Sequence, residues 1–107
     1  MSVNKERQSI KEWPIDERPR EKAMLHGIAS LSKSELLAIL VGSGNDEESA
    51  VAMMKRVLAS CGDSIAELAR LSVDDLCQFR GIGPAKAITI VAACELWKRR
   101  AGDEKPE

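Results

Sequence analysis

Apolar residues recur along most of this chain at the three- and four-residue spacing of amphipathic helices. The clearest stripe runs through residues 50–61, where apolar side chains stand at positions i, i+3, i+4, i+7, i+8 and i+11. A second long stripe, within residues 84–100, consists of Ala87, Ile90, Val91, Cys94 and Trp97. The one β-rich stretch, residues 88–91, lies inside that stripe, and no segment alternates as a strand does. The pattern predicts an all-α fold, a compact bundle of five or six helices.

Serines and glycines mark the ends of the predicted helices. Ser32, Ser64 and Ser72 each precede a Glu or Asp by three residues, which is the spacing of a capping box. Gly62 is a stop signal after the stripe at 50–61, and Pro19 suits the first turn of a helix. These signals predict helices that begin near residues 19, 33, 50, 65, 73 and 84.

The chain divides into a tail, one domain and a second short tail. Residues 1–11 are polar and aperiodic, so we expect them to be disordered. Residues 12–101 carry the helical stripes and are predicted to form the domain, with residues 102–107 as a linker or tail. We expect Trp13 to pack as an anchor for the extended arm, with an exposed base-stacking ring as the alternative.

Two expectations concern the segment after Pro19. The residues expected to face inward from its helix are Ala23, Met24 and Ile28. His26 is the only histidine and has no metal-binding or catalytic partner in the pattern, so we expect it on the surface near a helix end.

Composition limits the classes of function. The 107 residues carry a net charge of −1, so any binding of nucleic acid must depend on a local patch. Cys61, Cys77 and Cys94 have no close spacing, and we expect buried, reduced thiols in a cytoplasmic protein, with no metal site. Nothing resembles a membrane span or a signal peptide, so no membrane partner is expected.

Residues 76–87 contain the most informative motif. Gly81 and Gly83 leave the backbone bare, and Pro84 suits the first turn of the next helix, so free N–H groups are expected at its mouth. A helix N-terminus of this kind favours an anion, and Lys86 adds a positive charge. The run resembles the helix-hairpin-helix motif, whose loop offers main-chain amides to DNA phosphates. The alternative is a tight connection between two packed helices.

The candidate DNA-binding residues follow from this motif. They are Arg80, Gly81, Ile82, Gly83, Ala85 and Lys86, with Lys98, Arg99 and Arg100 as peripheral contacts. The last three also suit the C-terminal end of a helix dipole, and that is the alternative role for them. No cofactor is expected, although related hairpins hold a monovalent cation on their loop carbonyls and the sequence leaves that point open.

The motif has a degenerate copy earlier in the chain. Residues 31–44 and 71–83 share a Leu-Ser pair, a cap, an apolar helix and Gly-x-Gly, about 40 residues apart. In the first copy an acidic stretch, residues 45–48, follows the glycines, and its carboxylates would repel a phosphate. We therefore expect a tandem helix-hairpin-helix domain with an intact second copy and a structural, or only weakly DNA-contacting, first copy.

Several motifs together resemble the N-terminal region of bacterial RadC-type proteins. They are Trp13-Pro14, the run at 17–22, Leu31-Ser32, residues 35–40, Gly42-Ser43-Gly44 and residues 81–87. The resemblance implies a helical hairpin domain, a link to DNA repair, and a following JAB/MPN-type domain with a zinc-binding His-x-His motif. With one histidine this chain cannot supply that motif, so any hydrolase activity would belong to the missing domain.

The motifs and the composition leave two candidate functions. The first is a non-enzymatic module that binds the DNA backbone without sequence specificity, weakly, with a dissociation constant on the order of 10 to 100 µM and a log–log salt slope near −2. The second is a protein-interaction module that serves the missing C-terminal domain, which the near-neutral charge and the acidic first hairpin favour. Intrinsic catalysis is not expected.

Overall fold

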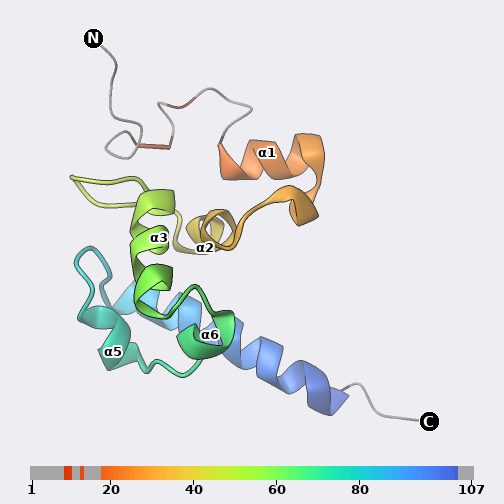
Figure 1. Cartoon of the computed structure of the whole chain (residues 1–107), viewed down its shortest axis with the longest axis vertical. Helices are drawn as coiled ribbons and strands as arrows, with labels where there is room; N and C mark the ends of the chain where they lie inside the picture. Colours follow the sequence, from red (N-terminus) through yellow and green to blue (C-terminus); the bar gives the residue numbers. More distant parts are fainter. Residues whose placement is uncertain (1–8, 11–12, 14–17, 104–107) are drawn as a thin grey trace.

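The computed structural model describes residues 9–10, 13 and 18–103. Their elements are α1 (Pro19–His26), the 3₁₀ turn η3 (Ile28–Ser30), α2 (Lys33–Val41), α3 (Ala50–Ser60), α4 (Ile65–Leu68), α5 (Val73–Cys77) and α6 (Pro84–Asp103). These residues form six α-helices and no strand, which confirms the all-α prediction (Figure 1). The predicted disordered tail at 1–11 lies outside the described residues, apart from Ser9 and Ile10.

The helix starts follow the serine caps. Ser32 and Ser72 both form reciprocal capping boxes, as predicted, with Glu35 and Asp75. At Ser64 only half of the predicted box forms, because its hydroxyl accepts from the Glu67 N–H whereas the Glu67 carboxylate lies 3.6 Å from the Arg70 guanidinium. A fourth cap was not predicted. The hydroxyl of Ser49, a residue only 2% exposed, accepts from the Ala52 N–H at 3.1 Å and caps the start of α3.

The core is organised around α3. Met53, Met54 and Val57 have no solvent exposure, so the methionines of this stripe are core residues, as the spacing predicted. The other elements contribute Leu37, Leu68, Leu76, Ile82, Ala87 and Ile90 to the same cluster. A smaller cluster holds Trp13 against α2 and α3, where the indole is 8% exposed. Trp13 therefore packs into the core, as predicted, and is not an exposed ring, whereas the arm that it was expected to anchor lies largely outside the described residues.

Some predicted core positions are wrong. Met24 is 87% exposed and Ile28 60% exposed, and Ala23 is only half-buried. The physical reason is that α1 buries little of itself beyond Pro19, and an ion pair of 3.0 Å between Lys22 and Glu35 ties it to α2 instead. A helix held by a polar contact at one edge does not need an apolar inner face.

The end of α6 also departs from its stripe. The helix runs three residues past its predicted end to Asp103, and its last turns extend away from the other helices (Figure 1). Trp97 is therefore 52% exposed, although Ala87 and Ile90 at the start of the same stripe are buried. The three cysteines are half-buried, not buried as predicted, and none of them forms a disulfide with another described residue. Among the described residues, no helix combines the length and the apolar character needed to cross a bilayer.

Candidate nucleic-acid interface

The second hairpin, residues 79–84, is a tight turn fixed to the core by one side chain. Gly81 has a φ of +89°, a conformation that glycine adopts without strain. The Ile82 N–H donates to the Phe79 carbonyl at 3.1 Å, and the Ile82 side chain, 4% exposed, packs into the core. Ile82 thus anchors the turn from inside, while Gly81 and Gly83 are exposed on the outside.

Main-chain donors lie open at this turn. The N–H groups of Gly83, Ala85 and Lys86 have no acceptor within the described residues, and Pro84 has no N–H. The first turn of any α-helix leaves such donors unsatisfied, and here the helix is 20 residues long. Its dipole therefore adds a partial positive charge at the place where the free N–H groups stand. This arrangement can hold an anion by main-chain atoms alone.

The two glycines of this turn differ in what the fold requires. A Cβ on Gly81 would lie 2.5 Å from the Asn45 side-chain nitrogen and 2.9 Å from the Met53 sulfur, in addition to the strain of its φ. A Cβ on Gly83 would meet nothing within 4 Å, and the φ of Gly83 is not in the left-handed region. Packing therefore explains a glycine at position 81 but not at position 83.

The first hairpin, residues 42–49, is closed by its own polar groups. The side-chain oxygen of Asn45 accepts from the main-chain N–H groups of Glu47 and Glu48, at 2.8 and 3.0 Å. The Asn45 N–H donates back to the Glu48 carbonyl at 3.1 Å. Because these N–H groups already have acceptors, the first hairpin has fewer donors left for a phosphate than the second. That this hairpin is structural, or contacts DNA only weakly, stays a prediction.

The first hairpin braces the second. The Lys86 ammonium donates to the Gly44 carbonyl at 3.1 Å, so the predicted phosphate-binding cation is tied to the neighbouring loop. Arg80 forms an exposed ion pair of 3.4 Å with Glu47. These contacts place the two glycine hairpins side by side, and none of the individual contacts was predicted from the sequence.

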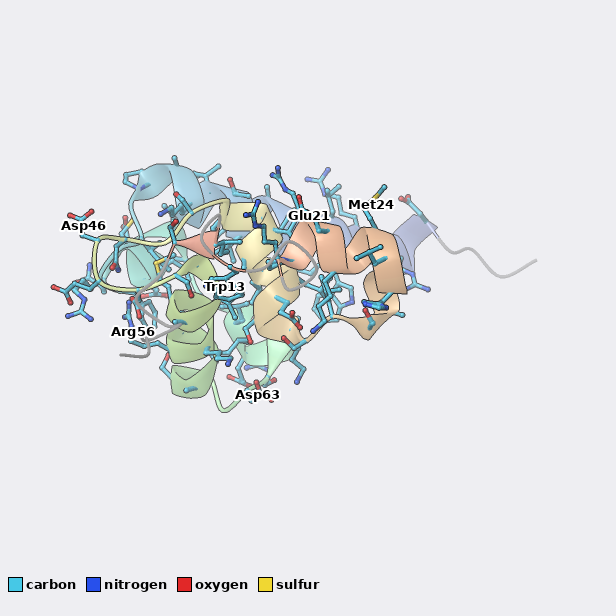
Figure 2. All side chains as sticks on the ribbon, turned by 90° about the horizontal axis from the view of Figure 1, so that it is seen from above. Trp13, Glu21, Met24, Asp46, Arg56 and Asp63 are labelled. Atoms are coloured by element: carbon cyan, nitrogen blue, oxygen red, sulfur yellow. The ribbon has the colours of Figure 1, made fainter. Side chains whose placement is uncertain are left out.

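Arg56 is a member of this site that sequence reasoning missed. Its side chain leaves α3 on the flank of the two loops (Figure 2), pairs with the Glu48 carboxylate, and donates to the Arg80 carbonyl at 2.7 Å. The hydrogen bond from the Arg56 guanidinium lowers the pKa of the Glu48 carboxyl below its usual value, against an opposing effect of burial. No motif identifies Arg56, because its partners are distant in the sequence.

Charges at the site are balanced. Arg56, Arg80 and Lys86 stand against the carboxylates of the acidic loop, residues 46–48. The Arg80 and Glu47 side chains are 65% and 64% exposed, so water screens their attraction and the pair can open. No carboxylate among the described residues accepts from the N–H groups of Gly83, Ala85 or Lys86, and Gly83 and Ala85 are exposed residues.

The predicted peripheral residues lie at the other end of α6. At 1.5 Å per residue, Lys98 stands about 18 Å along the helix from Lys86. Lys98 donates to the Ala69 carbonyl at 3.0 Å and Arg99 pairs with Glu95 at 3.0 Å, while Arg100 is exposed. The structure does not bring these three residues to the hairpin. Within the described part of the chain, no three His, Cys, Asp or Glu side chains are grouped to share a metal ion.

Comparisons with known proteins give this site its family context. UPF0758 proteins of Flavobacterium johnsoniae and Porphyromonas gingivalis are 50% identical over 96 residues and 43% identical over 99 residues. These matches cover 90% and 92% of this chain but only 42% and 44% of the relatives, so the chain spans about two fifths of their length. No solved structure matches the chain significantly. The family model UPF0758 N-terminal matches residues 10–88, and the chain therefore belongs to the UPF0758 family.

Proposed function

We propose that this domain binds the DNA backbone, without base specificity, through its second hairpin and the first turn of α6. The observation that carries the proposal is the set of N–H donors of Gly83, Ala85 and Lys86 that lack an acceptor among the described residues, at the start of a 20-residue helix where Gly83 and Ala85 are exposed residues. A phosphate oxygen is the acceptor that such donors bind best. Phosphate contacts fix position on a duplex without reading its sequence, so no base preference is expected.

Gly83 supports this proposal independently of the helix dipole. Since neither φ nor packing requires a glycine there, its missing side chain serves mainly to leave the adjacent N–H groups uncovered. Close approach of the backbone to a ligand is a common reason for such a glycine.

The charges of the site set the expected strength. Lys86 is bonded to a neutral carbonyl and gives up no carboxylate when it contacts a phosphate, whereas Arg80 must exchange Glu47 for a phosphate. One to two phosphates would thus be neutralised, which gives a log–log salt slope between about −1 and −2. The dissociation constant should lie on the order of 10 to 100 µM at physiological salt.

Fluorescence anisotropy with a labelled 20-base-pair duplex, titrated at several KCl concentrations, tests the proposal. Lys86→Glu should weaken binding about tenfold and reduce the slope by about one. Arg70→Glu is the matched control, because it makes the same charge reversal on an exposed arginine that follows Ala69, near Lys98 and far from the hairpin. Equal binding by wild type and Lys86→Glu would remove the proposed site.

The resemblance to RadC-type proteins suggests a wider role, which we include in this proposal. We extend the proposal to a role in DNA repair, with the hairpin domain delivering the longer relatives to DNA and any zinc-dependent hydrolysis lying outside this chain. The support is the match of residues 10–88 to the N-terminal model and the additional length of the relatives. Assaying a full-length relative for DNA-stimulated hydrolysis tests the extension, and activity that ignores added duplex would argue against it.

One observation favours a second function, which is binding to another protein. Leu96 is 71% exposed and Trp97 52% exposed on the projecting end of α6, where a partner helix or domain would find apolar surface. Because Trp13 is buried, quenching of tryptophan fluorescence by acrylamide reports mainly on Trp97, and a partner that covers Trp97 should reduce this quenching. Under this alternative, Trp97→Ala abolishes self-association or partner binding in sedimentation velocity and leaves DNA binding unchanged.

A further inference from the structure

Arg56 links the two hairpins through a chain of hydrogen bonds. The Asn45 side-chain nitrogen donates to the Glu48 carboxylate at 3.0 Å, and the same carboxylate accepts from Arg56. The Arg56 guanidinium then donates to the Arg80 carbonyl at 2.7 Å. The Glu48 side chain is only 14% exposed and that of Arg56 34% exposed, so water competes less here than at the Arg80–Glu47 pair.

The contact acts on the peptide unit that precedes the hairpin glycine. The Arg80 carbonyl and the Gly81 N–H belong to one planar peptide group, so fixing the oxygen also fixes the direction of the N–H. Gly81 has wide conformational freedom, and without an external contact this peptide plane would rotate easily. We infer that Arg56 is a positioning residue: it holds the Arg80–Gly81 peptide plane, and with it the phosphate-binding turn, against the first hairpin.

This inference rests on the proposed DNA function for its consequence but not for its geometry. It assigns a task to the degenerate hairpin, whose Glu48 carboxylate, 14% exposed, holds Arg56 in place, whereas Asp46 and Glu47 remain exposed. Nη2 of Arg56 donates both to Glu48 and to the Arg80 carbonyl, while Nε donates to the second Glu48 carboxylate oxygen at 3.5 Å. Lysine carries all its donors on one nitrogen, so Arg56→Lys loses this two-nitrogen grip on the carboxylate that orients the side chain toward the Arg80 carbonyl.

The variant Arg56→Lys tests the geometry at constant net charge. Amide hydrogen exchange should accelerate about fivefold or more at Ile82, whose N–H closes the turn onto Phe79, while amides in the middle of α6 keep their rates. Arg70→Lys makes the same chemical change at an exposed pair with Glu67 and should alter neither set. Unchanged exchange at Ile82 in Arg56→Lys would overturn the inference.

DNA titration of the same variants gives the functional measurement. Arg56→Lys should weaken duplex binding about three- to tenfold with an unchanged salt slope, because no phosphate contact is lost. In the Lys86→Glu background the further loss should shrink to less than about twofold, since both residues act through one turn. Additive losses would show that Arg56 and Lys86 act independently and would refute a positioning role.

The two proposals fail in distinguishable ways. If wild-type protein does not bind duplex, the proposed function is wrong, and exchange at Ile82 still decides whether Arg56 positions the turn. If wild type binds and Lys86→Glu does not, yet Arg56→Lys matches wild type in both measurements, the positioning role is wrong and the DNA site stands.

Discussion

Gly44 is the position where the fold leaves least room for a side chain. A Cβ there would lie 2.1 Å from the Glu48 carbonyl oxygen, 2.5 Å from the Ser49 carbonyl carbon and 2.7 Å from the Ala50 nitrogen. All three are backbone atoms, so Gly44→Ala must displace the loop that leads into α3. Overpacking of this kind costs about 1–3 kcal/mol, and the lost bond from the Asn45 N–H adds about 1 kcal/mol. The stiffer unfolded chain offsets about 0.4–1 kcal/mol, which leaves a destabilisation of about 2 kcal/mol.

Urea unfolding followed by far-ultraviolet circular dichroism measures this effect. The midpoint of Gly44→Ala should fall by about 1 M with an unchanged m-value, and the melting temperature by about 10 °C. Gly83→Ala is the matched control in the other hairpin, and its stability should stay within about 0.5 kcal/mol of wild type because a Cβ there meets nothing within 4 Å. If Gly44→Ala were as stable as Gly83→Ala, the loop would not be packed as described.

Three further outcomes follow from the contacts. Glu47→Gln should tighten DNA binding about two- to fivefold at low salt, because it releases Arg80 and removes a repelling carboxylate; weaker binding would contradict this. The hydrogen bond from Arg56 lowers the pKa of the Glu48 carboxyl, so this pair stabilises the fold fully above the ordinary pKa of a glutamate and is lost as the pH falls through the lowered pKa. In urea titrations the stability difference between wild type and Glu48→Gln should therefore shrink as the pH is lowered through the acid range, and a difference that does not change with pH would contradict the pairing. Ser49→Ala should lower the free energy of unfolding by about 1 kcal/mol, and no change would argue against its capping role.

Local signals in the sequence account for most of the fold. A cap depends on residues within three positions of one another, so Ser32 and Ser72 could be read directly and both formed as predicted. The apolar stripe of α3 was also sufficient to predict the helix and its buried face, since a helix buried on one face must carry apolar residues at helical spacing. The glycine hairpin was found for the same reason: its turn is encoded by adjacent residues.

The errors arise where a position depends on what lies beyond its own helix. Trp97 continues the stripe of α6, but the stripe gives no information on whether a neighbouring helix reaches that far. Met24 was expected inside because it is apolar, whereas α1 is attached by the pair between Lys22 and Glu35. Arg56 was missed because its partners, Glu48 and the Arg80 carbonyl, are 8 and 24 residues away. Contacts of that range have no local signature.

Gly44 and Gly83 occupy equivalent positions in the two hairpins, but only one of them is required by packing. In the first copy Gly44 is needed by the fold, since backbone atoms fill the space that a side chain would occupy. In the second copy Gly83 is not needed by the fold, and the space beside it is open. If both copies served only to connect helices, both glycines would have packing reasons, or neither would. The difference is what we expect when one hairpin supports the structure and the other keeps its main-chain donors bare for a ligand.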